Sequence, residues 1–144
     1  MSEHALWGTV RDRLARDGVW DRVENRVLRG MADTNYLVKG VEGWVELKHR
    51  DAWPARAGGT VTLEHFTSWQ REWLRTRWLN GGHAYMLLYI QRARTYLLFD
   101  GFTASQIVGL DTRAEHERVA LVIGHSAFPT EELKAILYVK RPGN

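Results

Sequence analysis

Two charged side chains in the segment Glu46-Leu47-Lys48 are separated by one residue. On a β-strand both would point to the same face, because side chains alternate between the two faces of a strand. A carboxylate and an ammonium placed side by side can bind a divalent cation and direct a water molecule at a phosphodiester. A Glu-x-Lys tripeptide is also common on solvated strand faces, so its meaning depends on the residues around it.

A second acid, Asp33, lies thirteen positions before Glu46 and shortly after Gly30. A tight turn at Lys39-Gly40 would fold this region into a hairpin and bring Asp33 beside Glu46. Two carboxylates on neighbouring strands provide the oxygen ligands that magnesium prefers, and manganese is expected to substitute for it. The residue types and their spacing therefore predict a magnesium site with Lys48 next to it.

The first half of the chain must supply a scaffold for these residues. A helix is expected over residues 4–15, because Leu6, Val10 and Leu14 recur at intervals of four. Loose alternation and turn glycines predict three strands, at residues 19–27, 36–38 and 44–48. Residues 51–62 have little periodicity and are expected to form a loop or flap.

The second half of the chain is expected to complete a sheet. A helix is predicted over residues 68–79 with Thr67 as its N-cap, followed by two apolar strands at 84–90 and 95–99. A short helix at 104–108, a strand at 119–123 and a last helix capped by Thr130 follow. The expected fold class is α/β, with a mixed central β-sheet flanked by helices in one domain spanning residues 1–144.

Composition limits the class of protein. The 144 residues are 44% hydrophobic, which is enough for the core of one domain. The absence of cysteine excludes disulfides and thiolate metal sites. No apolar stretch is long enough to span a membrane and the N-terminus lacks a signal pattern, so a cytoplasmic protein is expected. The net charge of +3, carried mostly by arginine, permits a nucleic-acid partner without requiring one.

Three segments follow one another in an order and spacing typical of a known superfamily. They are Gly30-Met31-Ala32-Asp33, then Trp44-Val45-Glu46-Leu47-Lys48, then Gln70 with Trp73. On these residues the chain resembles the PD-(D/E)xK nucleases, and within them the archaeal-type Holliday junction resolvases and related small nucleases carried by phages. The resemblance implies a restriction-endonuclease-like core. Ala32 stands where the family often has proline.

The resemblance also implies roles for individual residues. Asp33 and Glu46 would hold magnesium together with the backbone carbonyl of Leu47. Lys48 would orient or deprotonate the attacking water and stabilise the charge that develops on the phosphorane.

Two more residues are candidates at the catalytic centre. These resolvases often carry an acid on the first helix; here that helix offers only Glu3 and Asp12, and Glu24 is expected to take the role instead. Gln70 corresponds to a helix glutamine near the active site of related nucleases. Thr67-x-x-Gln70 is equally a capping-box pattern, so both interpretations of Gln70 stay open.

DNA contacts are expected from arginines around the acids and from one loop tryptophan, namely Arg22, Arg26, Arg29, Arg50 and Trp53. Some of these arginines could instead only solvate strand edges. The expected partner is branched DNA bound by a homodimer, because the chain has no room for a separate sequence-reading domain. A Holliday junction resolvase is the first prediction. The alternatives are a related phage-type replication or repair nuclease acting on flaps or single strands, and a non-catalytic DNA-binding domain on the same fold.

Overall fold

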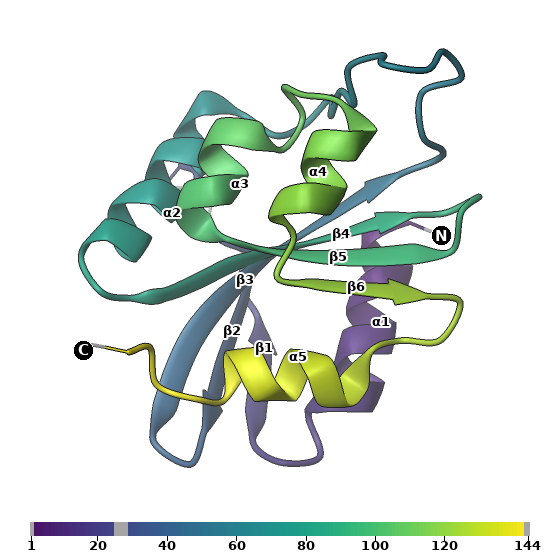
Figure 1. Cartoon of the computed structure of the whole chain (residues 1–144). Coiled ribbons are helices and arrows are strands. Elements are labelled where there is room, and N and C mark those ends of the chain that lie inside the picture. Colours follow the sequence, from purple (N-terminus) through teal and green to yellow (C-terminus); the bar gives the residue numbers. More distant parts are fainter. Residues whose placement is uncertain (1, 25–28, 143–144) are drawn as a thin grey trace.

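The centre of the computed structural model is a six-stranded β-sheet in the order β1-β2-β3-β4-β5-β6 (Figure 1). The structure describes residues 2–24 and 29–142. The strands are β1 (Val19–Arg22), β2 (Thr34–Val38), β3 (Val41–Arg50), β4 (His83–Ile90), β5 (Thr95–Asp100) and β6 (Val122–His125). β3 and β4 run parallel, and every other neighbouring pair of these strands is antiparallel. The sheet is therefore mixed, as predicted.

Helices cover both faces of this sheet (Figure 1). One face is covered by α1 (Glu3–Leu14) and α5 (Thr130–Leu137), and the other by α2 (Ser68–Leu79), α3 (Gly101–Ile107) and α4 (Arg113–Val119). The predicted fold class, an α/β fold with a mixed central sheet flanked by helices, is confirmed. In the part of the chain that is described, no helix has the length and apolar character needed to cross a membrane.

Strand β4 lies between two hydrophobic cores, one on each face of the sheet. Its residues Tyr85 and Leu87 pack in the core under α1 and α5, while Met86 and Leu88 pack in the core under α2 and α3. A strand buried on both faces must be apolar at every position, which explains the continuous apolar run in the sequence. The prediction that this segment forms the buried centre of the sheet is confirmed.

The hairpin between β2 and β3 positions the first acid. Lys39 and Gly40 both have positive φ, of 49° and 83°, as a two-residue hairpin turn requires. Pairing runs from Val38 opposite Val41 to Thr34 opposite Val45. Asp33, which directly precedes β2, is thereby brought to the position beside Glu46 that the sequence predicted.

Two predictions for the C-terminal third are wrong. The predicted strand at 119–123 is instead the end of α4 followed by β6, because Thr112 caps a helix there by accepting a 3.2 Å hydrogen bond from the Glu115 backbone N–H. The apolar run from Val119 to Ile123 thus spans a helix end and a strand start. Thr130 is the first residue of α5 and not its cap; Pro129 is the N-cap residue, without a side-chain hydrogen bond.

Gly30 is required where the loop before Asp33 meets α2. Its φ is +82°, and an added Cβ would lie 2.2 Å from the Trp69 carbonyl oxygen. Gly30→Ala is therefore expected to lower the free energy of unfolding by at least about 2 kcal/mol, since strain and a backbone clash add. Urea unfolding followed by circular dichroism measures this loss.

Gly58 provides the matched control, because its φ is +76° but an added Cβ would meet no atom within 4 Å. Gly58→Ala should cost only the conformational strain, about 1 kcal/mol. Equal losses at the two positions would show that contact with α2 does not matter at Gly30.

Candidate active site

Charged side chains from three parts of the chain converge at β3. Asp33 lies just before β2, Glu46 and Lys48 lie on β3, and Glu3 lies in the first turn of α1. The Leu47 backbone N–H donates a 3.0 Å hydrogen bond to Asp33 Oδ1. Lys48 Nζ lies 3.7 Å from Glu46 Oε1 and 3.9 Å from Glu3 Oε1. The acids thus share one neighbourhood around a single ammonium group.

Alternation along β3 separates the reactive side chains from the core. Val45 and Leu47 pack in the core under α1 and α5, so Glu46 and Lys48 point to the opposite face. Both charged residues are nonetheless buried, with Glu46 only 2% and Lys48 only 4% exposed. Buried charges of this kind require partners within the protein or a bound ion.

Lys48 is held in place from the loop between β3 and α2. Its ammonium donates a 2.9 Å hydrogen bond to the backbone carbonyl of His65. A cavity of about 460 Å³ opens beside it, lined by Glu3, Lys48 and His49 together with the loop segment that includes His65. The cavity therefore borders an ammonium group whose position is already fixed.

Burial and mutual repulsion change the protonation of the two central acids. Burial raises the pKa of Asp33 to about 6, and the negative charge of Glu3 adds to this, while the Leu47 N–H and Lys48 act against it. Burial, and then the charge of Asp33, raises the pKa of Glu46 well above its ordinary value. The positive charge near the two acids is thus too small to balance both carboxylates when they are ionised. A divalent cation would supply what is missing.

The donor atoms fit magnesium. Glu46 Oε2 is buried without a hydrogen-bond partner among the described residues, which leaves it free to bind an ion. The N–H and C=O groups of one strand residue point to the same side of the strand. The Leu47 carbonyl therefore faces the side of β3 on which the Leu47 N–H binds Asp33. Within residues 2–24 and 29–142, no group of three or more acids or histidines could hold a metal. Two carboxylates and one carbonyl suit magnesium, which keeps several waters.

Sequence reasoning passed over Glu3. The Ser2 side chain accepts a 3.2 Å hydrogen bond from the Ala5 N–H, so α1 begins at Glu3, one residue earlier than predicted. The acid is thereby placed near Lys48. Glu24, to which the sequence assigned this role, follows β1 and is exposed. A serine directly before an apolar-periodic segment is the signal that could have located this helix start.

Because Glu3 and Glu24 lie in different places, replacing each with glutamine should affect DNA cleavage differently. Glu3→Gln should reduce metal-dependent DNA cleavage by about 10-fold or more, because it removes a charge beside Lys48. Glu24→Gln should change cleavage less than 3-fold, within the scatter of ordinary surface substitutions. Initial rates on one labelled DNA substrate compare the variants. A larger loss for Glu24→Gln would return the role to Glu24.

Gln70 forms the capping box that the sequence suggested as one of its roles. The Thr67 N–H donates to Gln70 Oε1 at 3.0 Å, and the Gln70 N–H donates to Thr67 Oγ1 at 3.2 Å. The first turn of α2 also packs against Gly30, so Gln70 lies near the loop that leads to Asp33. Its catalytic role stays a prediction.

The predicted DNA-contacting arginines lie in different surroundings. Arg22 ends β1, and its charge lowers the pKa of Asp33, which places it near the acids. Arg29 is exposed. Arg50 donates to the carbonyls of Thr62, at 2.9 Å, and Ala52, and its DNA contact stays a prediction. Arg50 thus braces the loop over the site.

The two remaining predicted contacts differ in what the structure describes. Trp53 is half-buried, and the Arg113 guanidinium carbon lies 5.0 Å from the centre of its ring. Arg26 lies outside the described residues. A DNA contact by either residue stays a prediction.

Solved structures, rather than sequences, provide the likeness to known proteins. No protein-family model matches the chain, and no curated protein matches it either. Among solved structures, the fold is similar to Hjc, a Holliday junction resolvase from the archaeal hyperthermophile Archaeoglobus fulgidus. The TM-score is 0.43 and the identity 17%, over 65% of this chain and 74% of that chain. We infer the function from the chain's own residues.

Proposed function

We propose that the chain is a magnesium-dependent DNA endonuclease. The observation that carries this proposal is the meeting of half-buried Asp33 with buried Glu46 and Lys48. The Leu47 N–H links Asp33 to β3 by a 3.0 Å hydrogen bond, and Lys48 Nζ lies 3.7 Å from Glu46 Oε1. Asp33, Glu46 and the Leu47 carbonyl would hold the cation. An oxygen-only seat beside a fixed ammonium suits hydrolysis of a phosphodiester.

Each residue has a distinct task in this proposal. Magnesium, when bound, polarises a phosphate oxygen and favours ionisation of a water molecule. Lys48 orients the attacking water and stabilises the negative charge that accumulates on the phosphorane. Glu3, 3.9 Å from Lys48 Nζ, keeps the ammonium directed at the reacting phosphate. The His65 carbonyl fixes the same group from the loop side, so little reorganisation is needed during reaction.

The proposed substrate is branched DNA, with the four-way junction first. Exposed Arg29 and Arg22, which lies near the acids, provide positive charge for phosphates around the site. A four-way junction can be recognised by its shape. Two copies of the chain in a homodimer would position two active sites to cut two strands of the junction symmetrically. Sedimentation velocity tests the dimer: a monomer at micromolar concentration, with and without junction, would contradict it.

Cleavage of a substrate panel tests the activity. Four-way junction, flap, single-stranded and linear duplex DNA are incubated with the protein and magnesium, manganese or calcium. Paired cuts in the junction are expected with magnesium and manganese but not with calcium. Preference for flaps or single strands would support the replication and repair type instead. Failure to nick any DNA in a clean preparation would leave a DNA-binding domain without catalysis.

A further inference from the structure

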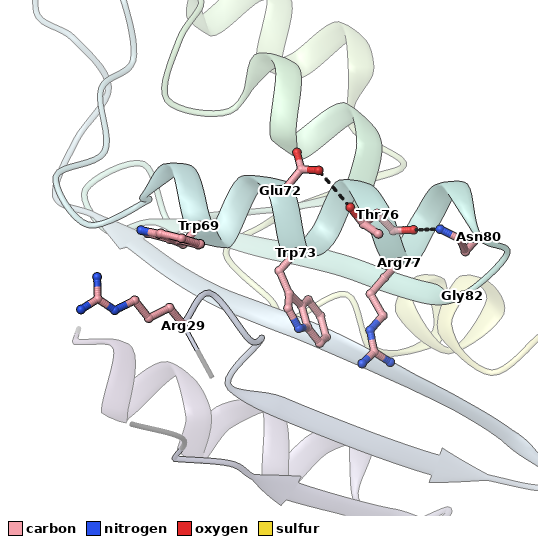
Figure 2. A pocket seen from close by; sticks show the side chains of 8 residues that line it. All are labelled: Arg29, Trp69, Glu72, Trp73, Thr76, Arg77, Asn80 and Gly82. Atoms are coloured by element: carbon pink, nitrogen blue, oxygen red, sulfur yellow. Dashed lines mark hydrogen bonds between the residues drawn. The ribbon is translucent and has the colours of Figure 1, made fainter. Parts of the chain in front are cut away.

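A second feature of the surface lies along α2, outside the cluster of acids. A groove of about 550 Å³ follows this helix and is lined by Trp69, Trp73 and Arg77 from α2 and by Arg29 from the loop before Gly30 (Figure 2). The three α2 residues are spaced four apart, so they lie on one side of the helix. Figure 2 shows Arg29 at the end of the groove that Trp69 occupies.

The two tryptophans of the groove are in different situations. Trp73 packs edge-on against Trp44, with ring centres 5.5 Å apart, and the Arg77 guanidinium carbon lies 4.5 Å from the Trp73 ring centre. Trp69 is 59% exposed. The fold therefore uses Trp73 in packing, whereas much of the Trp69 indole faces solvent.

The charge of the groove is positive. Arg29 and Arg77 line it, and its acid, Glu72, is engaged elsewhere on the helix: its Oε1 accepts a 3.1 Å hydrogen bond from Thr76 and lies 3.9 Å from an Arg75 nitrogen. Arg29 lies at the Trp69 end of the groove, and Arg77 lies about two helical turns further along it, over the Trp73 ring. Cations spaced along a groove with an open aromatic ring match the chemistry of an unpaired polynucleotide. Its bases stack on aromatic rings and its phosphates bind guanidinium groups. An uncharged peptide would use the ring but not the cations.

The groove starts next to the proposed active site. Gly30 lies three residues before Asp33, and a Cβ added to Gly30 would lie 2.2 Å from the Trp69 carbonyl oxygen. From Trp69 to Asn80 the helix is about 16 Å long, from its rise of roughly 1.5 Å per residue. A nucleotide segment that leaves the acids can therefore continue along α2 for several residues.

We propose that this groove binds an unpaired segment of the DNA substrate, with a base stacked on Trp69 and phosphates bound by Arg29 and Arg77. The proposal rests on the proposed nuclease function for the identity of its ligand. Within the proposed function, it favours branched substrates that expose unpaired nucleotides near the cut, such as flaps, over a fully paired four-way junction.

Binding without divalent metal tests the groove separately from cleavage. The full chain is titrated, in EDTA, into a fluorescently labelled 12-nucleotide thymidine strand while anisotropy is recorded. Trp69→Ala should weaken binding by about 10-fold, the size expected for losing one base stack. Leu79→Ala is the matched control, because Leu79 is 56% exposed on the same helix and does not line the groove. It should change affinity less than 2-fold, and thermal unfolding verifies that both variants fold.

An abasic strand of the same length separates stacking from phosphate binding. The wild type should lose about 10-fold in affinity for this strand, whereas Trp69→Ala should lose little, because its stacking partner is already gone. Arg77→Gln should lower the slope of log affinity against log salt by about 0.7, the value for one lost phosphate contact with a single strand.

Several results would overturn the proposal. They are no binding of the thymidine strand by the wild type, equal affinity in Trp69→Ala, or equal sensitivity of both proteins to base removal. Equal sensitivity to base removal could be accompanied by a second finding, that the wild type is a dimer and Trp69→Ala a monomer in sedimentation velocity. The two results together would assign the groove to a second copy of the chain. Trp69-dependent binding in a protein that never nicks DNA with manganese would reject the nuclease but retain the groove.

Discussion

Asp33→Asn is expected to lose metal-dependent DNA cleavage by at least about 1,000-fold while retaining DNA binding. The amide keeps the size of the side chain and can still accept the hydrogen bond from the Leu47 N–H. It removes one of the two charges proposed to hold the cation, so the loss should fall on the reaction and not on the fold. Initial cleavage rates with manganese, and anisotropy with the same DNA in calcium, measure the two effects.

Asp21→Asn is the matched control for this variant. Asp21 is an exposed acid on β1, the strand next to β2. The Asp21→Asn variant should cleave DNA at the wild-type rate within about 2-fold. If Asp33→Asn kept more than about a tenth of the wild-type rate, Asp33 would not be a metal ligand on which the reaction depends.

Glu46→Gln is expected to stabilise the metal-free protein by about 1–2 kcal/mol at pH 8, although it abolishes cleavage. At this pH the wild type keeps Glu46, whose pKa is raised by burial and by the charge of Asp33, in a site where one of its oxygens has no partner among the described residues. A neutral amide removes this repulsion, while Lys48 keeps Glu3 and the His65 carbonyl as partners. Urea unfolding in EDTA measures the difference.

The pH dependence of the metal-free wild type follows from the same acids. The pKa of Asp33 is about 6 in the folded protein and 3.8 without the fold, so between these values the folded state binds more protons than the unfolded state. Raising the pH therefore favours unfolding, and this contribution to stability, fully present below pH 3.8, is lost as pH rises through about 6. The raised pKa of Glu46 acts in the same direction.

Unfolding curves between pH 4 and 8 should therefore show the advantage of Glu46→Gln over the wild type growing as pH rises. Excess manganese should reverse the order, because it binds the folded wild type and adds to its stability. A Glu46→Gln variant less stable than the metal-free wild type at pH 8 would contradict the electrostatic account of the site.

Local signals in the sequence were sufficient for the elements that position the central acids. Lys39-Gly40 has the residue types of a two-residue turn, and the turn fixes the register that places Asp33 beside Glu46. Thr67 and Gln70 form a capping box, and α2 runs over the predicted residues 68–79. The apolar run of β4 identified the centre of the sheet. In each case the determinant lies within a few residues of the feature.

Features that depend on distant contacts were not accessible in the same way. The apolar run after Arg118 read as a strand because nothing local shows that Val119 still belongs to α4. Glu3 was passed over because its proximity to Lys48 depends on how α1 docks on the sheet. The hydrogen bonds of Arg50 to the Thr62 and Ala52 carbonyls depend on the path of the loop over the site, and its DNA contact stays a prediction.

A crystal grown or soaked with manganese tests the central claim most directly, because its anomalous density locates the ion without any assumption about substrate. We predict a peak between Asp33 and Glu46, with carboxylate oxygens of both and the Leu47 carbonyl at about 2.0–2.3 Å, and no peak there in Asp33→Asn. The absence of density between the two carboxylates at millimolar manganese, or acids turned away from each other, would contradict the metal site and the nuclease with it.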